Sequence, residues 1–346
     1  MKIRKWIKLY ITIPIVAIAS IFTFNFIIDP YSLTAYNLLK IPNKFARDDR
    51  KEKVARLYKA EQFDNMIFGS SRTYSMNPNT VTKYLGGSTY NAGVGTARIE
   101  DALGFLLFLE KLNKLPKNVI IGLDFYSFNE NVETNKYFLQ NDELNFMNKS
   151  NSYDNYFGKF LSIDALRASF KTLKNFFKNS KDRPRFSLNG GLAGISNINN
   201  YYPVNRTSEP FNTAYVNKEF NFIKTIHYTK LSQNRLNYLK QIMNLSAKYN
   251  INTYIFLTPL HTQLIQKIKA DSETNIALGL FKKEIVEITP YYDFISSNSI
   301  NDDSAYFGFD LTHASSSTGN LIFARMFNDK NITLPNTFGK FIKKRL

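Results

Sequence analysis

An uncharged apolar run near the N-terminus, Leu9–Ile28, is the feature that most constrains the fold of this chain. About twenty apolar residues are enough for a helix to span the hydrocarbon core of a bilayer. Basic residues precede the run, and this placement favours a cytoplasmic N-terminus. A cleaved signal peptide is the alternative, but its apolar region usually has about 7–15 residues, and the Ala17-Ile18-Ala19 site lies inside the run. We therefore expect residues 1–30 to form an uncleaved single-pass anchor, with the rest of the chain outside a bacterial cytoplasmic membrane.

The composition excludes some functions and leaves others open. The sequence has 346 residues and no Cys, which excludes thiol nucleophiles, thiolate metal sites and disulfides. Lys and Arg number 45 against 28 Asp and Glu, which gives a net charge of +17. This excess fits solubility alone, or attraction to phospholipid headgroups, teichoic acid or acidic polysaccharide. Nucleic acid is not an expected partner, because the basic residues are spread along the chain without a recognition motif.

Beyond a charged juxtamembrane stalk at 31–62, apolar runs alternate with amphipathic helical patterns. The expected strands are 64–68, 88–91, 118–125, 252–257 and 291–295. The expected helices are 97–112, 230–249, 271–286 and 315–328. This alternation predicts an α/β domain at 63–330 with a parallel sheet covered by helices on both faces.

Two segments depart from the alternation. Residues 128–222 are rich in Asn, Phe, Tyr, Lys and Ser, and we interpret them as an insertion or lid over the sheet. The aromatic residues of this insertion would line a carbohydrate or lipid site, or form a small core of its own. Residues 331–346 are expected to form a basic C-terminal tail.

The first chemical signal is Ser71, which follows an expected strand in the sequence Phe68-Gly69-Ser70-Ser71-Arg72. Ligands bind at the carboxyl ends of parallel strands, where a serine on a tight turn is exposed. Backbone amides nearby can stabilise the oxyanion that forms when a serine attacks a carbonyl. The alternative is a helix N-cap, a position that Ser also favours.

The second signal is Asp310-Leu311-Thr312-His313, just before the last expected helix. The sequence contains only three histidines, namely His227, His261 and His313. The spacing lets Asp310 orient the imidazole of His313 while its other nitrogen faces a serine. The alternative is an Asp that caps a turn beside an exposed His.

Other residues at strand ends are candidates for lesser roles. Gly93, in Asn91-Ala92-Gly93, would present a backbone amide to the oxyanion. His261 would line the pocket or serve as a turn residue. No metal or cofactor is expected, because the histidines share no helix face and no carboxylate cluster has a calcium-loop pattern.

Taken together and in this order, these motifs resemble the serine, glycine and Asp-x-x-His blocks of the SGNH/GDSL hydrolase superfamily. The resemblance implies a three-layer, flavodoxin-like parallel sheet. It also implies Ser71 as the nucleophile, an oxyanion hole from the amides of Ser71 and Gly93, and His313 as the base with Asp310 behind it. A further motif differs from the family pattern, because Asp124 stands where the family supplies an oxyanion-binding Asn. The chain is similar in this respect to a membrane-anchored branch that includes the D-alanyl transfer protein of teichoic acid systems and SGNH-like proteins of polysaccharide O-acetylation.

The resemblance implies a serine acyltransferase or esterase that acts on O-acetyl or D-alanyl groups of a cell-envelope glycan or teichoic-acid-like polymer through an acyl-serine. It also implies a membrane-bound O-acyltransferase partner. Arg72 would bind an anionic substrate group or form a surface salt bridge, and the remaining candidate substrate-binding residues are Asn91, Asp124 and His261. A non-catalytic glycan-binding scaffold and a lipid esterase are the alternatives. The catalytic interpretation requires Ser71 Oγ and the His313 ring to lie within about 4 Å of each other.

Overall fold

The structure is a computed structural model that describes residues 2–30, 39, 49–147, 160–177, 186–192, 209–225, 230–308 and 310–344. The chain forms two compact units. The first contains Met1–Ala60 and Asn141–Pro184, and the second contains Glu61–Gln140 and Arg185–Leu346. The segment interpreted as one insertion at 128–222 is thus divided between the units, and it lies only partly within the described residues, as does the predicted stalk at 31–62.

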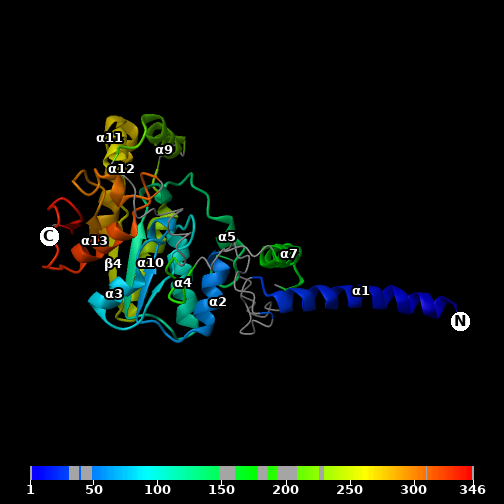
Figure 1. The fold of residues 1–346 in the computed structure, drawn as a ribbon. Coiled ribbons are helices and arrows are strands. Elements are labelled where there is room, and N and C mark those ends of the chain that lie inside the picture. The colour runs from blue at the N-terminus through cyan, green and yellow to red at the C-terminus, as the bar shows by residue number, and fades with distance from the viewer. Residues whose placement is uncertain are drawn as a thin grey trace. The chain divides into compact units, whose positions relative to one another are not determined.

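The first unit is helical (Figure 1). Its helices are α1 (Lys2–Ile28), α2 (Asp49–Lys59) and α7 (Ile163–Phe177). The apolar part of α1, Trp6–Ile28, is long and apolar enough to cross a membrane. Most side chains along it are exposed, whereas a core helix of a soluble protein would bury them.

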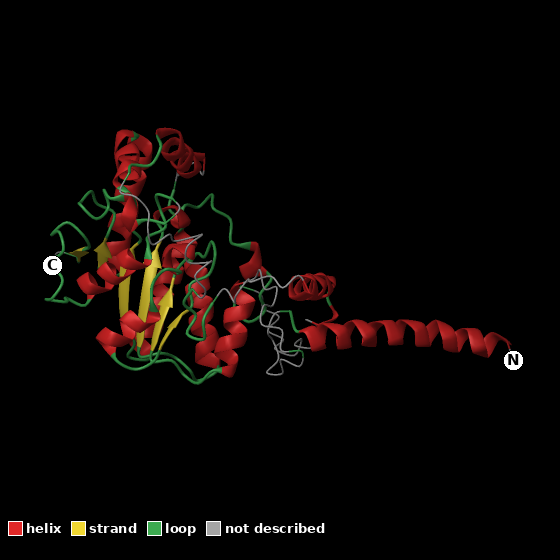
Figure 2. Cartoon of the chain, in the orientation of Figure 1, coloured by secondary structure: helices red, strands yellow, loops and turns green. Residues whose placement is uncertain are grey.

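The second unit is built on a six-stranded sheet with helices around it (Figures 1 and 2). Its strands are β1 (Asn65–Phe68), β2 (Thr89–Asn91), β3 (Asn118–Leu123), β4 (Asn252–Leu257), β5 (Tyr291–Asp293) and β6 (Lys340–Ile342). Its α-helices are α3 (Pro78–Leu85), α4 (Ile99–Lys111), α5 (Lys136–Leu139), α9 (Thr213–Thr225), α10 (Gln233–Lys248), α11 (Thr262–Ala270), α12 (Ser272–Ile288) and α13 (Ser316–Met326). Short 3-10 helices are η1 (Ser71–Thr73), η2 (Phe125–Phe128) and η4 (Ser304–Tyr306).

The strand order is β2-β1-β3-β4-β5-β6. The first five strands are parallel, with Ile67 of β1 paired to Ile120 of β3, and β6 runs antiparallel to β5. All carboxyl ends of the parallel strands therefore lie along one edge of the sheet. The chain reverses its direction of travel across the sheet between β1 and β3, and such switch points form the crevice in which open α/β sheets bind ligands.

Side chains of alternate residues pack on opposite faces of the sheet. On one face, Ile67, Ile120 and Phe256 belong to a core that includes Val81 of α3 and Ile322 of α13. On the other face, Phe68 contacts Phe105 of α4. The helix α4 packs on α10, which also packs on α12. Both faces are buried, which explains why the strands are nearly continuous apolar runs instead of alternating patterns.

The predicted α/β class with a mostly parallel sheet is confirmed. Several elements differ from the sequence interpretation, among them α11, which was not expected. Helix α3 was missed because only its cap, Asn77, and first residue, Pro78, mark it in a short segment. The segment interpreted as a C-terminal tail contributes β6, and Phe338 just before this strand packs edge-on against Phe294 in the core, at 4.8 Å between ring centroids.

The C-terminal segment is therefore expected to stabilise the second unit. Replacing the fully buried Phe338 (Phe338→Ala) should lower the free energy of unfolding by about 3–5 kcal/mol, because it leaves a cavity in the core. The matched control is Phe341→Ala on β6, where the side chain is 50% exposed, with an expected loss of about 1 kcal/mol or less. Chemical unfolding of the full chain measures both losses. Equal losses would contradict the assignment of Phe338 to the core.

Candidate active site

Ser71 lies where β1 ends at the switch point of the sheet. The strand ends at Phe68, and Gly69 follows with a φ of +150°, a conformation that favours glycine. Ser70 caps η1, and its side chain accepts a hydrogen bond from the Arg72 amide at 3.2 Å. The two serines therefore have different roles: Ser70 is buried and caps the 3-10 turn, and Ser71 begins this turn with its side chain partly accessible.

The turn is held by close packing around Thr73. Its hydroxyl donates to the carbonyl of Ser70 at 2.8 Å. A Cβ added to Gly69, Gly93 or Gly122 would lie within 3 Å of the Thr73 side chain. Glycine is therefore required near the ends of three strands, because any larger residue would displace the turn that carries Ser71.

His313 reaches Ser71 from the loop that precedes α13. The carboxylate of Asp310 accepts hydrogen bonds from the amides of Thr312 and His313, both at 2.7 Å, and from the Thr312 hydroxyl at 2.9 Å. Its second oxygen contacts His313 Nδ1 at 2.7 Å. One carboxylate thus closes the turn and orients the imidazole.

Ser71 Oγ lies 2.8 Å from His313 Nε2, within the 4 Å that the catalytic interpretation requires. Because Nδ1 faces the carboxylate of Asp310, it carries the proton in the neutral ring. Nε2 is then the acceptor, and the Ser71 hydroxyl donates to it. This is the arrangement in which a histidine can remove the proton of a serine as it attacks a carbonyl.

The electrostatics keep Asp310 ionised. Burial alone would raise the pKa of this carboxyl group, but the hydrogen bond and charge of His313 and the amides of Thr312 and His313 lower the pKa to about 2. The carboxylate is therefore negative throughout the physiological pH range. It can stabilise the positive charge that His313 acquires on taking a proton from Ser71.

Arg72 points into the protein and pairs with Asp124 at 3.4 Å. Asp124 also accepts hydrogen bonds from the Thr258 hydroxyl at 2.7 Å and from the Tyr126 hydroxyl at 3.4 Å. The Arg72 guanidinium lies over the Tyr126 ring, 4.7 Å from its centroid. Asp124 is thus an acceptor in a buried network.

The negative charges near Arg72 raise its pKa. Burial would lower this pKa, but the charges of Asp124, Asp310 and Glu219 together outweigh burial. Burial, followed by the charge of Asp124, raises the pKa of the Tyr126 phenol to about 12, so the ring stays neutral. The site therefore holds one fixed guanidinium within electrostatic reach of Asp310.

The roles expected for Gly93 and Asn91 are corrected. The Gly93 amide, expected in the oxyanion hole, donates to the side chain of Asn91 at 2.9 Å. Asn91, expected to bind substrate, is fully buried and donates to the carbonyls of Thr73 and Met76 at 2.7 and 2.9 Å. Asn91 therefore fastens the nucleophile turn to β2, and Gly93 is needed because it passes close to Thr73.

The expectation that His261 lines the pocket is also corrected. It is buried and caps α11, with its ring between Phe211 and Phe307 at centroid distances of 5.0 and 5.2 Å. Its amide donates to the carbonyl of Leu311 at 2.8 Å. His261 therefore supports the loop that carries Asp310 and His313 from behind. His227 lies outside the described residues.

Sequence reasoning missed Glu219 on α9. Burial raises the pKa of this carboxyl group, and the charge of Asp310 raises it further, against the positive charges of Lys218, Arg72 and His313. Helix α9 is held near the site by Phe222, whose ring meets that of Tyr126 at 6.4 Å. No sequence signal identifies Glu219, because it lies within the segment interpreted as an insertion.

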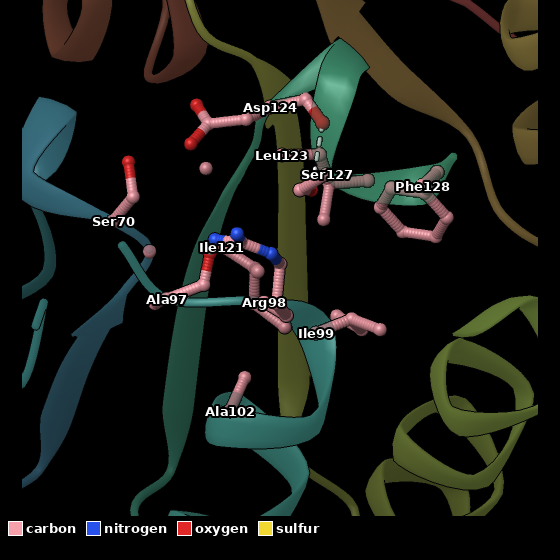
Figure 3. A pocket seen from close by; sticks show the side chains of 12 residues that line it. Ser70, Ala97, Arg98, Ile99, Ala102, Ile121, Leu123, Asp124, Ser127 and Phe128 are labelled. Carbon is pink, nitrogen blue, oxygen red and sulfur yellow. Dashed lines mark hydrogen bonds between the residues drawn. The ribbon is translucent and has the colours of Figure 1, made fainter. Parts of the chain in front are cut away.

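Two hollows lie beside these residues. The smaller, of about 10 Å³, lies between the end of β3 and the start of α4, with Ser70 and Asp124 on one side and Phe128 on the other (Figure 3). It has room for about one water molecule and is not lined by Ser71 or His313. The larger is a groove of about 440 Å³. Its lining residues are Arg98, Tyr126, Asn131, Val132, Glu133, Thr134, Lys136 and Phe222.

We regard the groove as the candidate substrate site. Its Tyr126 side contacts the guanidinium of Arg72, the residue that follows Ser71 in the sequence, whereas Ser71 and His313 do not line the groove. A volume of this size suits a small ligand or a segment of a polymer. Among the described residues, no group of three or more His, Asp or Glu side chains could hold a metal ion.

No protein-family model matches the chain, and no curated protein matches it.

The low pKa of Asp310 predicts a pH-dependent contribution to stability. Because the folded pKa lies below the unfolded value of about 3.9, the ionised carboxylate stabilises the fold above that value, and this contribution disappears as the pH falls toward about 2. Asp310→Asn should therefore lower the free energy of unfolding by about 2 kcal/mol at pH 7, and by less near pH 3. Chemical unfolding at both pH values measures the change, with the exposed Asp302→Asn as control. A loss that is the same at both pH values would contradict this account.

The buried Arg72–Asp124 pair predicts an asymmetric response to substitution. Asp124→Asn leaves the guanidinium buried without a counter-charge, and should cost about 3 kcal/mol of stability. The double variant Arg72→Met/Asp124→Asn should lose less, because no unpaired charge remains. Thermal unfolding of the three proteins tests this. Full stability of Asp124→Asn alone would show that the pair is not required.

Proposed function

We propose that this protein is a membrane-anchored, extracytoplasmic serine acyltransferase or esterase, with Ser71 as nucleophile, His313 as general base and Asp310 as its orienting acid. The observation that carries the proposal is the contact of 2.8 Å between Ser71 Oγ and His313 Nε2, continued by 2.7 Å from His313 Nδ1 to Asp310. The three residues come from two distant segments of the chain. A structural hydrogen bond would need neither the ionised acid nor the partly accessible serine.

In the proposed reaction, Ser71 Oγ attacks the carbonyl carbon of an acyl donor while its proton passes to His313 Nε2. The imidazolium is stabilised by Asp310 and then returns the proton to the oxygen that leaves with the donor alcohol. The acyl group remains on Ser71 as an ester. A sugar hydroxyl or water, deprotonated by His313, attacks this ester and releases the serine. Acyl transfer and hydrolysis differ only in the second acceptor.

The negative oxygen of the tetrahedral intermediate needs positive partners. The proposed partners are the amide of Ser71 at the start of η1 and the fixed charge of Arg72. Gly93 and Asp124 do not serve, because the Gly93 amide is bonded to Asn91 and Asp124 is an acceptor. Such a limited hole would make activity on simple esters weak, and favours a specific donor that brings its own binding energy.

The fold supports an SGNH-type, flavodoxin-like assignment. Its parallel strands follow the order 2-1-3-4-5 of flavodoxin-like folds, and Ser71 follows β1 at the switch point of the sheet. The additional antiparallel strand β6 lies at the far edge, away from β1. The chain resembles the SGNH/GDSL superfamily in the order of its serine, glycine and Asp-x-x-His motifs.

The groove supports a glycan or glycopolymer as acceptor. Tyr126 and Phe222 offer aromatic faces on which a sugar ring can stack, and Arg98 and Lys136 offer positive charge to an acidic polymer. The apolar helix α1 would anchor the protein in a bacterial cytoplasmic membrane, with the basic N-terminus in the cytoplasm. By resemblance to the membrane-anchored branch, a membrane-bound O-acyltransferase would supply the acyl group, O-acetyl or D-alanyl.

A non-catalytic, glycan-binding scaffold is the second candidate. The observation that favours it is the lack of two expected hydrogen-bond donors for an oxyanion. The Gly93 amide already donates to Asn91, and Asp124 stands where the resemblance to the SGNH family implies an Asn. Such a protein would use the groove alone and leave Ser71 unreactive.

A fluorophosphonate probe, which phosphonylates serines activated by a base, separates the two functions. Wild-type protein should be labelled on Ser71, and His313→Ala should lose most of the labelling because the serine is no longer deprotonated. Ser299→Ala is the control: this serine is exposed and takes no part in the turn that carries Ser71, so its loss should leave Ser71 labelled. Mass spectrometry of the peptide identifies the labelled residue. Folded wild-type protein that resists the probe would favour the scaffold.

A further inference from the structure

Helix α7 carries its large apolar residues on a face that is only partly used for packing. Its buried side chains are small: Ala165, Ala168, Ser169 and Thr172. Its large apolar side chains recur at a spacing of three and four residues, which places them on one stripe of the helix. We call this set the α7 stripe, and it consists of Ile163, Leu166, Phe170, Leu173 and Phe177.

Three residues of the α7 stripe are turned outward, and the other two, Leu166 and Leu173, are half-buried. Phe170 is 60% and Phe177 78% exposed, and Ile163 is exposed as well. A helix on the surface of a soluble domain turns its apolar stripe to the core, so this arrangement is inverted. Exposed apolar surface of this extent marks a site of contact with a protein or a membrane.

The small face of α7 packs against the C-terminal end of α1. The Ser169 hydroxyl donates to Asn25 Oδ1 at 2.8 Å, and Asn25 Nδ2 donates to the carbonyl of Phe160 at 2.6 Å. Phe170 of the stripe contacts Phe24 of α1, with ring centroids 5.1 Å apart. The apolar surface of α1 therefore continues directly into the α7 stripe.

The position on α1 fixes the depth of this contact. The apolar part of α1, Trp6–Ile28, is about 34 Å long at 1.5 Å per residue. The hydrocarbon core of a bilayer is about 30 Å thick. If the helix spans the bilayer with Trp6 at one interface, Phe24 and Asn25 lie near the other. Any element that is hydrogen-bonded to Asn25 then lies at the level of the lipid headgroups.

The charges of α7 suit the same position. Arg167, Lys171 and Lys174 are exposed beside the stripe, and Asp164 is the one acidic residue of the helix. Helices that lie in the membrane interface combine Phe and Leu on one face with Lys and Arg on the other, because the basic side chains meet anionic headgroups.

We propose that α7 is a second membrane-binding element, which lies in the outer interface of the bilayer with the α7 stripe in the acyl-chain boundary and its basic residues among anionic headgroups. The occupant of the exposed face is thus lipid. This inference rests on the membrane anchoring in the proposed function, but it is independent of the chemistry at Ser71.

The sequence offers a direct test, because it contains a single Trp, at position 6. In a Trp6→Phe background, a new Trp is placed on the stripe (Phe177→Trp or Ile163→Trp) or on the charged face as a matched control (Asp164→Trp). The full chain is reconstituted in nanodiscs that contain phosphatidylglycerol and phosphatidylcholine with brominated acyl chains. Circular dichroism verifies that the helices form. Extraction at alkaline pH verifies independently that α1 holds the chain in the bilayer.

The proposal predicts a blue-shifted emission for both stripe variants, strong quenching by the brominated chains, and protection from acrylamide in water. Asp164→Trp should show the opposite pattern. Stripe variants that acrylamide quenches as efficiently as Asp164→Trp would overturn the proposal. Emission that is blue-shifted but quenched by neither agent would also overturn it, because a protein surface would then cover the stripe. Serine labelling of the same samples reports on the active site separately.

Discussion

The carboxylate of Asp310 is the interaction on which the candidate site depends. It binds two backbone amides and one hydroxyl of its own turn and leaves its second oxygen for His313. Because the same group shapes the loop and orients the imidazole, the loop cannot change its conformation without also releasing the base. The buried His261 supports this loop from the other side through its hydrogen bond to Leu311. The turn that carries Ser71 is likewise held by several hydrogen bonds, which involve Ser70, Thr73 and Asn91.

A second constraint is the buried positive charge beside the nucleophile. The charge of Arg72 is neutralised by Asp124. Because a buried ion pair needs further hydrogen bonds, Asp124 also accepts from the hydroxyls of Thr258 and Tyr126. The acid at position 124 is therefore explained by its pairing with Arg72. The Arg72 and Tyr126 contact also connects the site to the groove.

Much of the fold follows from the sequence, because buried parallel strands and amphipathic helices leave strong local patterns. The runs before Gly69 and at 118–123 and 252–257 are of this kind, and the structure forms β1, β3 and β4 there. The strand β6 leaves no such pattern, since it has three residues and one strand neighbour. Ser71, Asp310 and His313 were predicted from local motifs and are brought together in space. The roles of Asn91, Gly93 and His261 were not predictable, because they depend on which hydrogen-bond partners the rest of the fold provides. Glu219 and the groove depend on α9, which no motif marks.

The central claim is that Ser71 is an acyl-accepting nucleophile. Its most direct test is to incubate the full-length protein with an activated acetyl ester, quench with acid, and map the modified peptide by mass spectrometry. The account predicts one acetyl group on Ser71, which accumulates when the acceptor is absent and disappears in His313→Ala. Acetyl groups scattered over lysines, with Ser71 unmodified in a protein that retains its fold, would contradict it.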